Sequence, residues 1–201
     1  VGNCIIDDEA CCEASKQEII RRYYTCLNQY VQGDASEDEV ANIELLMQQA
    51  KISTDFRAVT QAAKARAKKE KVPTAAIELA DGTIITSKTT PLLGTSAALL
   101  LNATKHLAGI DHKVKLIPKE MIEPIQQMKV ELLSGNNPRL HTDEVLVALA
   151  MLSKDDENCK KALEQLANLK GCQVHTSVML SEVDRKIFKK VDYFLLLTFV
   201  A

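Results

Sequence analysis

The fold is decided by residues 75–87, AAIELADGTIITS, in which two apolar runs flank the dipeptide Asp81-Gly82. An Asp-Gly pair in this setting is typical of a tight β-hairpin turn, because glycine readily adopts the positive φ that such turns need. The stretch comes directly after Pro73, where a helical pattern stops. We therefore expect an antiparallel hairpin here, and with it the start of an α/β subdomain.

Helices and strands alternate after the hairpin. We expect helices over residues 97–106, 118–134, 142–153, 156–170 and 181–190, and short strands over residues 114–117, 174–180 and 193–200. The first of these helices is so apolar at its start that we expect it to be buried on more than one side. Strands that alternate with helices form layered sheets with right-handed crossovers. Residues 74–201 are therefore predicted to form a layered α/β subdomain with a mixed sheet.

Three amphipathic helices precede the hairpin. Apolar side chains recur every three or four residues from Asp8 to Gln32, and Gly33 supplies a stop. Residues 36–39, SEDE, are typical of a capping box that opens a second helix, and a third helix is expected from about residue 53. We predict a helical subdomain over residues 1–73, so the fold class is an α/β mixture.

Composition argues against nucleic acid and membranes as partners. The 25 Lys and Arg side chains nearly balance 27 Asp and Glu, and the net charge is -2. The basic run at residues 64–71 has no interleaved aromatic side chains, so we interpret it as a solvated helix end. The uncharged stretch at residues 193–201 falls well short of the roughly 20 residues of a membrane-spanning helix.

The cysteines and histidines follow no metal-binding pattern. The chain has 6 Cys and 4 His but no Cys-x-x-Cys pair and no His-Glu-x-x-His motif, so no metal site is predicted. Cys11 and Cys12 are adjacent, which suits a disulfide framework poorly, and no signal peptide is recognisable. Reduced thiols in the cytoplasm are expected, and whether a cofactor is bound stays unknown from the sequence. Because Val1 lies in what reads as a structured segment, we also expect further protein before it.

Polar groups gather just before the helix that is predicted from Thr142. Arg139 and the backbone N–H groups at this helix start could hold an anion. His141 with Asp143 or Glu144 could instead form an acid and base pair. The alternative is ordinary capping, in which Thr142 is the N-cap and the two acids interact favourably with the helix dipole.

A second polar loop precedes the apolar helix at residues 97–106. Lys88, Thr95 and Ser96 lie between a strand and this helix, where an N-terminus can receive phosphate or carboxylate. The loop lacks the spacing of a P-loop and the glycines of a dinucleotide fingerprint, so capping by Thr95 or Ser96 is the alternative. Asn102, farther along, is expected to be buried and to need a partner, which a neighbouring backbone group could supply.

Several stretches together resemble a bacterial family known as domain of unknown function 1846. They are GNCIIDDE at 2–9, SKQEIIRRYY at 15–24, LLG at 92–94, SAALLLNA at 96–103 and NPRLHTDEVL at 137–146. The resemblance covers residues 1–190 and implies the C-terminal half of a larger protein, whose first half carries a glycine-rich element like a nucleotide-binding loop. It implies no reaction. After Lys190 the chain departs from the family pattern, which fits a truncation or a change of reading frame.

Three functions stay open, and the sequence does not decide whether the chain is an enzyme. The first is an accessory, ligand-facing part of a larger cytosolic, nucleotide-binding protein, which is not catalytic alone and binds a phosphorylated or carboxylate ligand together with the missing N-terminal half. Its anion-holding residues would be Lys88, Thr95, Ser96, Asn102, Arg139, His141 and Asp143. The second is an interaction or assembly module, including a homo-oligomer. The third is a small-molecule hydrolase that uses His141 with Asp143.

Overall fold

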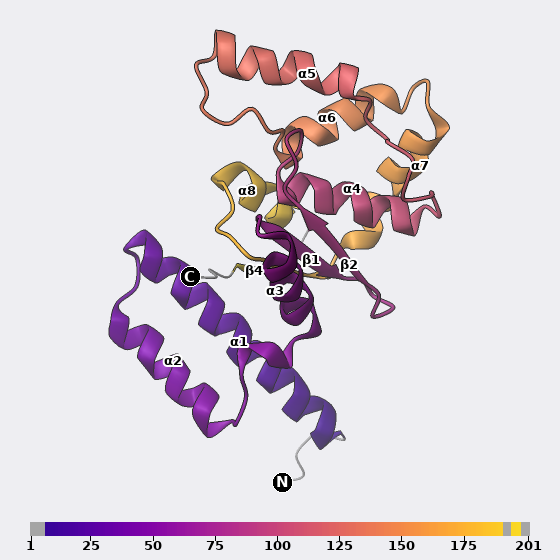
Figure 1. The fold of residues 1–201 in the computed structure, drawn as a ribbon. Coiled ribbons are helices and arrows are strands. Elements are labelled where there is room, and N and C mark those ends of the chain that lie inside the picture. The colour runs from indigo at the N-terminus through magenta and orange to yellow at the C-terminus, as the bar shows by residue number, and fades with distance from the viewer. Residues whose placement is uncertain (1–6, 191–193, 198–201) are drawn as a thin grey trace.

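The computed structural model describes residues 7–190 and 194–197 and combines helices with a small sheet (Figure 1). The elements in chain order are α1 (Asp8–Gln32), α2 (Glu37–Gln49), η1 (Thr54–Phe56), α3 (Ala58–Glu70), β1 (Thr74–Glu78), β2 (Ile84–Lys88), α4 (Thr95–Leu107), α5 (Lys119–Gln127), η2 (Met128–Leu132), α6 (Thr142–Leu152), α7 (Glu157–Glu164), η3 (Gln165–Leu169), β3 (Gln173–Thr176), α8 (Glu182–Lys190) and β4 (Phe194–Leu197). The predicted α/β mixture is confirmed.

The four strands form one mixed sheet in the order β2-β1-β3-β4. β1 pairs antiparallel with β2 and with β3, whereas β3 and β4 are parallel. The predicted hairpin is confirmed, and its turn has the expected chemistry: Gly82 has φ +81°, and the Asp81 carboxylate accepts a hydrogen bond from the backbone N–H of Thr83. Residues 193 and 198–200 of the expected last strand lie outside the described residues.

The sheet is covered on both faces, as the alternation of side chains along a strand requires. Ala75 and Ile77 of β1 pack in a cluster with Leu99 and Leu100 of α4. Ala76, between them, packs with residues of α3 on the other face. β1 therefore lies at the centre of a layered core, with α3 and α4 on opposite faces (Figure 1).

The first two helices form an antiparallel pair at one end of the molecule (Figure 1). Gly33 ends α1 in the left-handed region, and Ser36 and Glu39 form the predicted capping box of α2. Tyr24 of α1 is buried and its ring lies edge-on to the buried His175 of β3, with centroids 5.2 Å apart. The helical pair is thus attached to the sheet, and the division of the chain at residue 73 stays a prediction.

A second helical layer of α5, α6 and α7 covers the outer side of α4 (Figure 1). Ala97 and Leu101 of α4 pack there with Val145 and Leu149 of α6, which confirms that α4 is buried on two sides. Pro124 lies inside α5, and the chain continues as a π-helix from Met128. None of the helices within residues 7–190 is both long and apolar enough to cross a membrane.

Two predicted strands differ from the structure. Residues 114–117 are irregular, with bends at 116 and 117, instead of a strand, and the carbonyl of Val114 accepts a hydrogen bond from the Lys105 ammonium. The strand expected over residues 174–180 is the shorter β3, because the chain bends at residues 177 and 178. Ser177 still donates its N–H to the carbonyl of Thr74, and its hydroxyl accepts a hydrogen bond from the Thr74 N–H.

The capping box at Ser36 gives a stability prediction. Ser36→Ala removes the side-chain acceptor for the Glu39 N–H and should lower the free energy of unfolding by about 1 kcal/mol. Ser15→Ala is the matched control, because the Ser15 hydroxyl only donates to the carbonyl of Cys11 inside α1 and alanine is the better helix former. Urea denaturation of both variants checks this, and equal losses would contradict a capping role.

Candidate functional site

Three helices begin at one end of the sheet, where β2 and β3 stop. β2 and β3 both end beside the start of β1, since Lys88 pairs with Thr74 and Thr176 pairs with Ala75. β2 leads into α4 and β3 leads into α8, and the start of α6 is bonded to the loop before α4. There the N–H of Gly94 donates to the carbonyl of Leu140 at 3.1 Å, and the N–H of Leu140 donates to that of Leu92 at 3.0 Å. The two predicted polar helix starts therefore lie side by side.

The start of α6 is occupied by a carboxylate from α8. Asp184 is buried, and its Oδ1 accepts hydrogen bonds from the backbone N–H of Thr142 at 3.0 Å and from the Thr142 hydroxyl at 2.9 Å. The N-cap residue is His141, so the predicted capping by Thr142 is wrong. Asp184 instead supplies the negative charge that a helix N-terminus attracts.

The environment of Asp184 favours its charged form. Burial on its own would raise the pKa of this carboxyl, but hydrogen bonds from the Thr142 N–H, from His141, from Ser181 and from the Thr142 hydroxyl together hold the pKa below its usual value. Asp184 is therefore an internal anion at neutral pH and joins α8 to α6.

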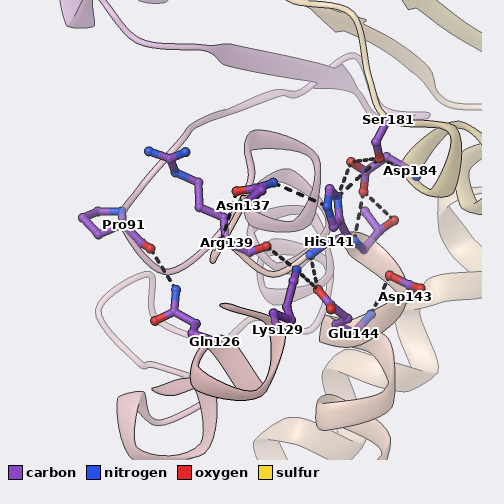
Figure 2. Close-up of polar contacts among 11 residues, drawn as sticks. Pro91, Gln126, Lys129, Asn137, Arg139, His141, Asp143, Glu144, Ser181 and Asp184 are labelled. Atoms are coloured by element: carbon purple, nitrogen blue, oxygen red, sulfur yellow. Dashed lines mark hydrogen bonds and ion pairs between the residues drawn. The ribbon is translucent and has the colours of Figure 1, made fainter. Parts of the chain in front are cut away.

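His141 pairs with Asp184 and not with Asp143 (Figure 2). Its Nδ1 lies 3.1 Å from Asp184 Oδ2 and 3.3 Å from the Ser181 hydroxyl, while that hydroxyl donates to Asp184 at 2.9 Å. In a hydrolytic triad the acid and the nucleophile bind opposite ring nitrogens, whereas here both bind Nδ1. Asp143 accepts a hydrogen bond from the neighbouring Glu144 N–H. This arrangement fixes the loop and the helix start.

Arg139 and His141 extend in different directions from the same loop (Figure 2). Arg139 is exposed, and its Nε donates to the carbonyl of Thr90 at 2.9 Å. Behind it, the ammonium of Lys129 donates to the carbonyl of Arg139 and to Glu144, whose carboxylate also accepts from the His141 N–H. The arginine therefore ties the loop to the segment before α4, and the histidine ties it to α8.

At the start of α4 the predicted residues have mixed roles. Thr95 and Ser96 are buried, and the Ser87 hydroxyl donates to the carbonyl of Thr95 at 2.7 Å. Gly94 is the N-cap, so the predicted capping by Thr95 or Ser96 is wrong. Asn102 is exposed where burial was expected, and its amide donates to the backbone carbonyl of Thr86 at 3.1 Å.

A cavity of about 610 Å³ lies between α4 and the segment that leads into α5. We call it the basic pocket, because its lining includes Arg66, Lys88, Lys105, His112, Lys115 and Lys119. Its other side chains are Thr90, Asn102 and a set of apolar residues, and no Asp or Glu is among the described lining residues. Two of the predicted ligand residues, Lys88 and Asn102, meet here, and Arg139 holds the backbone of Thr90 in the wall.

Lys105 is a buried cation with neutral partners. The residue is only 8% exposed, and its ammonium donates to the carbonyls of His112 and Val114. Burial lowers the pKa of Lys105, which the charge of Asp111 offsets only in part. An ammonium has three donors, and the described residues supply acceptors for two of those of Lys105.

The other cations of the basic pocket are differently engaged. Arg66 donates to the Thr86 hydroxyl, and its buried Nε has no hydrogen-bond partner within the described part of the chain. Lys88 pairs with Glu70 at 2.7 Å and Lys119 pairs with Glu123 at 2.8 Å, whereas Lys115 makes no ion pair among the described residues. Sequence reasoning missed this group because its members come from separate segments, and it assigned Arg66 to a solvated helix end. A lysine on the apolar helix α4 was the available signal.

The buried Asp184 gives a pH-dependent prediction. Asp184→Asn removes a charged acceptor and should lower the free energy of unfolding at pH 7 by about 1–3 kcal/mol. Because the folded pKa of Asp184 is depressed, its stabilising contribution is present above its unfolded pKa of about 3.9 and is lost as pH falls through the folded value. The difference between wild type and variant should therefore narrow below about pH 4.

Chemical denaturation from pH 7 to pH 3 measures this difference. Asp155→Asn, at an exposed position outside the network, is the matched control and should behave like wild type. A difference that stays constant down to pH 3 would contradict the assigned role of the carboxylate.

Comparisons with known proteins place the chain in one family. The family described as Domain of unknown function DUF1846, C-terminal, matches residues 55–195, and the corresponding N-terminal domain matches residues 1–51. The chain is 49% identical over 191 residues to UPF0371 protein cu0538 of Corynebacterium urealyticum, and 47% identical over 190 residues to UPF0371 protein DIP2346 of Corynebacterium diphtheriae. It is 44% identical over 191 residues to UPF0371 protein SpyM50764 of Streptococcus pyogenes.

These alignments take in 95%, 94% and 95% of this chain but only 38%, 38% and 39% of the three relatives. The chain thus spans less than two-fifths of the length of the curated relatives it matches. The predicted resemblance is confirmed, and the chain belongs to the DUF1846 family, whose relatives here carry the name UPF0371 protein.

Proposed function

We propose that this chain is the ligand-facing part of a larger cytosolic protein and that it binds a small phosphorylated or carboxylate molecule in the basic pocket. The observation that carries the proposal is the lining itself, with six basic side chains and no Asp or Glu among the described residues. Five of the six are Lys or Arg cations, and two of these, Lys88 and Lys119, already pair with Glu70 and Glu123. The other three make no ion pair among the described residues, and an anion would relieve their mutual repulsion. The volume of about 610 Å³ lies within the range of small-molecule sites.

We propose that the anion site expected from the sequence has its centre in the basic pocket. Lys88 and Asn102 are proposed as ligand contacts, and Arg139 as a residue that positions Thr90 in the wall. His141 and Asp143 are proposed to act at a distance, through the structure of the helix start. Thr95 and Ser96 belong to the packed start of α4, next to the loop that forms the rim of the pocket.

The chain is proposed to work together with the rest of a longer protein. Its relatives are more than twice its length, and the resemblance implies a glycine-rich element, like a nucleotide-binding loop, in the part that this chain does not include. Within the described residues, His141 and Ser181 both bind the Asp184 carboxylate, and the Thr60 hydroxyl, 3.2 Å from His175 Nδ1, is buried, so neither pair presents an accessible nucleophile beside a base. The chain alone is therefore proposed to bind and not to catalyse.

A role in assembly is the second candidate, and one groove favours it. The groove lies between α5 and α6, with Met121, Met128, Val147 and Met151 in its lining. These side chains are 40%, 43%, 60% and 62% exposed. Exposed apolar grooves of this kind are typical of protein contacts, either with another part of the protein or with a second copy.

Binding of pyrophosphate tests the ligand proposal. Isothermal titration calorimetry of the 201-residue chain should detect binding that weakens as salt is raised, because the interaction is electrostatic. Lys115→Ala should weaken the affinity about ten-fold, since a charge-assisted hydrogen bond contributes about 1.5–3 kcal/mol at most and this side chain is exposed. Lys88→Met should act in the same direction.

Lys154→Ala is the matched control, because Lys154 is also exposed and does not line the pocket. Its affinity should equal that of wild type. Equal weakening by all three substitutions would indicate diffuse charge attraction and contradict a defined site, and absence of binding to wild type would contradict the proposal altogether.

A further inference from the structure

The wall of the basic pocket beneath its cations is aliphatic. It consists of Pro91, Leu92, Leu93, Ala98, Leu101, Val114, Leu116, Ile117 and Ile122. Several of these residues belong to the core between α4 and the outer helical layer, so the wall is rigid and packed. A purely inorganic anion would contact the basic rim and leave this surface in water.

The pocket is also much larger than an inorganic anion. Its volume of about 610 Å³ compares with a share of about 30 Å³ for one water molecule in the liquid. A ligand that fills it must carry a further chemical group beside the charged one. The nature of the wall then indicates which group is favoured.

A nucleoside fits this wall poorly. Bases are usually held by stacking on aromatic side chains, and ribose hydroxyls by an Asp or Glu. No Phe, Tyr or Trp and no acidic residue is among the described lining, and its one imidazole, His112, is 87% exposed rather than set into the wall. The neutral polar groups are also engaged: the Asn102 amide donates to Thr86, and the Thr90 hydroxyl accepts from the Leu93 N–H at 3.0 Å. The lining thus offers few groups that would recognise a base or a sugar.

We infer that the ligand is an amphiphilic anion, namely a phosphate or diphosphate joined to an aliphatic chain. This inference rests on the proposed function, because it takes anion binding in the basic pocket as given. The charged head lies among Arg66, Lys88 and Lys115, of which Lys115 is exposed and makes no ion pair among the described residues. The aliphatic chain of the ligand lies along the apolar wall beside Ala98 and Leu101, where it displaces water from the aliphatic surface.

A series of alkyl phosphates tests the inference. Inorganic phosphate, ethyl, butyl and hexyl phosphate are titrated into the 201-residue chain at concentrations where none aggregates. The dissociation constant should fall roughly two- to four-fold for each added methylene, as expected for burial of aliphatic surface. Adenosine monophosphate, which has the same head group on a polar body, should bind more weakly than hexyl phosphate.

Ala98→Leu tests where the alkyl chain of the ligand binds. Ala98 is the smallest side chain in the wall and is only partly buried, so a leucine there should fill space that the longer ligands need. The increase in affinity from ethyl to hexyl phosphate should then be at least five-fold smaller than in wild type, while the affinity for inorganic phosphate is unchanged. Ala150→Leu, on the exposed side of α6, is the matched control and should keep the wild-type gain.

The outcomes separate this inference from the proposed function. If phosphate and pyrophosphate bind in a Lys115-dependent manner but affinity is flat along the alkyl series, or adenosine monophosphate binds more tightly than hexyl phosphate, the inference is overturned and anion binding stands. If no anion binds to the wild-type chain, the proposed function fails and the inference fails with it. The wild-type series gives this answer even if Ala98→Leu does not fold.

Discussion

Helix α4 is apolar on two faces, and both must be removed from water. One face packs on β1 and β3, and the other packs on α5, α6 and α7, so the sheet and the outer helical layer are both built on this helix. Burial of a single Leu or Ile side chain contributes about 1.5–3 kcal/mol, and α4 places such residues on either side. The bonds between the loop before α4 and Leu140 then align the start of α6 with it. The positions of the basic pocket and of the Asp184 network both follow from this double packing.

The starts of α6 and α4, at the same end of the sheet, differ in how their positive charge is balanced. At α6 the protein supplies its own anion, since Asp184 reaches across from α8 and accepts four hydrogen bonds. Beside α4 the cations outnumber their acidic partners, and one of them, Lys105, is buried against neutral carbonyls. A structural role accounts fully for the first arrangement. The second leaves donors that the described part of the chain does not use, which is why the ligand proposal is placed there.

Local signals predicted most of the secondary structure but little of the site. The Asp81-Gly82 turn, the ends of α1 and the capping box at Ser36 each depend on a few neighbouring residues, so they can be read from sequence. The strand expected over residues 114–117 failed, because the apolar run gave no sign that the Lys105 ammonium binds the local carbonyls. Likewise, His141 and Asp184 are far apart in sequence, and the cations of the basic pocket come from separate segments. Only the fold brings them together.

The order of the strands has a consequence for biosynthesis. β1 is central in the sheet, yet its partner β3 begins at Gln173, 85 residues after the hairpin ends at Lys88. At a translation rate of about 5–20 residues per second, one edge of β1 waits about 5–20 seconds on the ribosome before β3 is made. During that interval an apolar strand edge is open to pairing with other nascent chains. Helix α3 covers a face of β1 and leaves this edge open, so the nascent chain is exposed to mispairing there until β3 has been made.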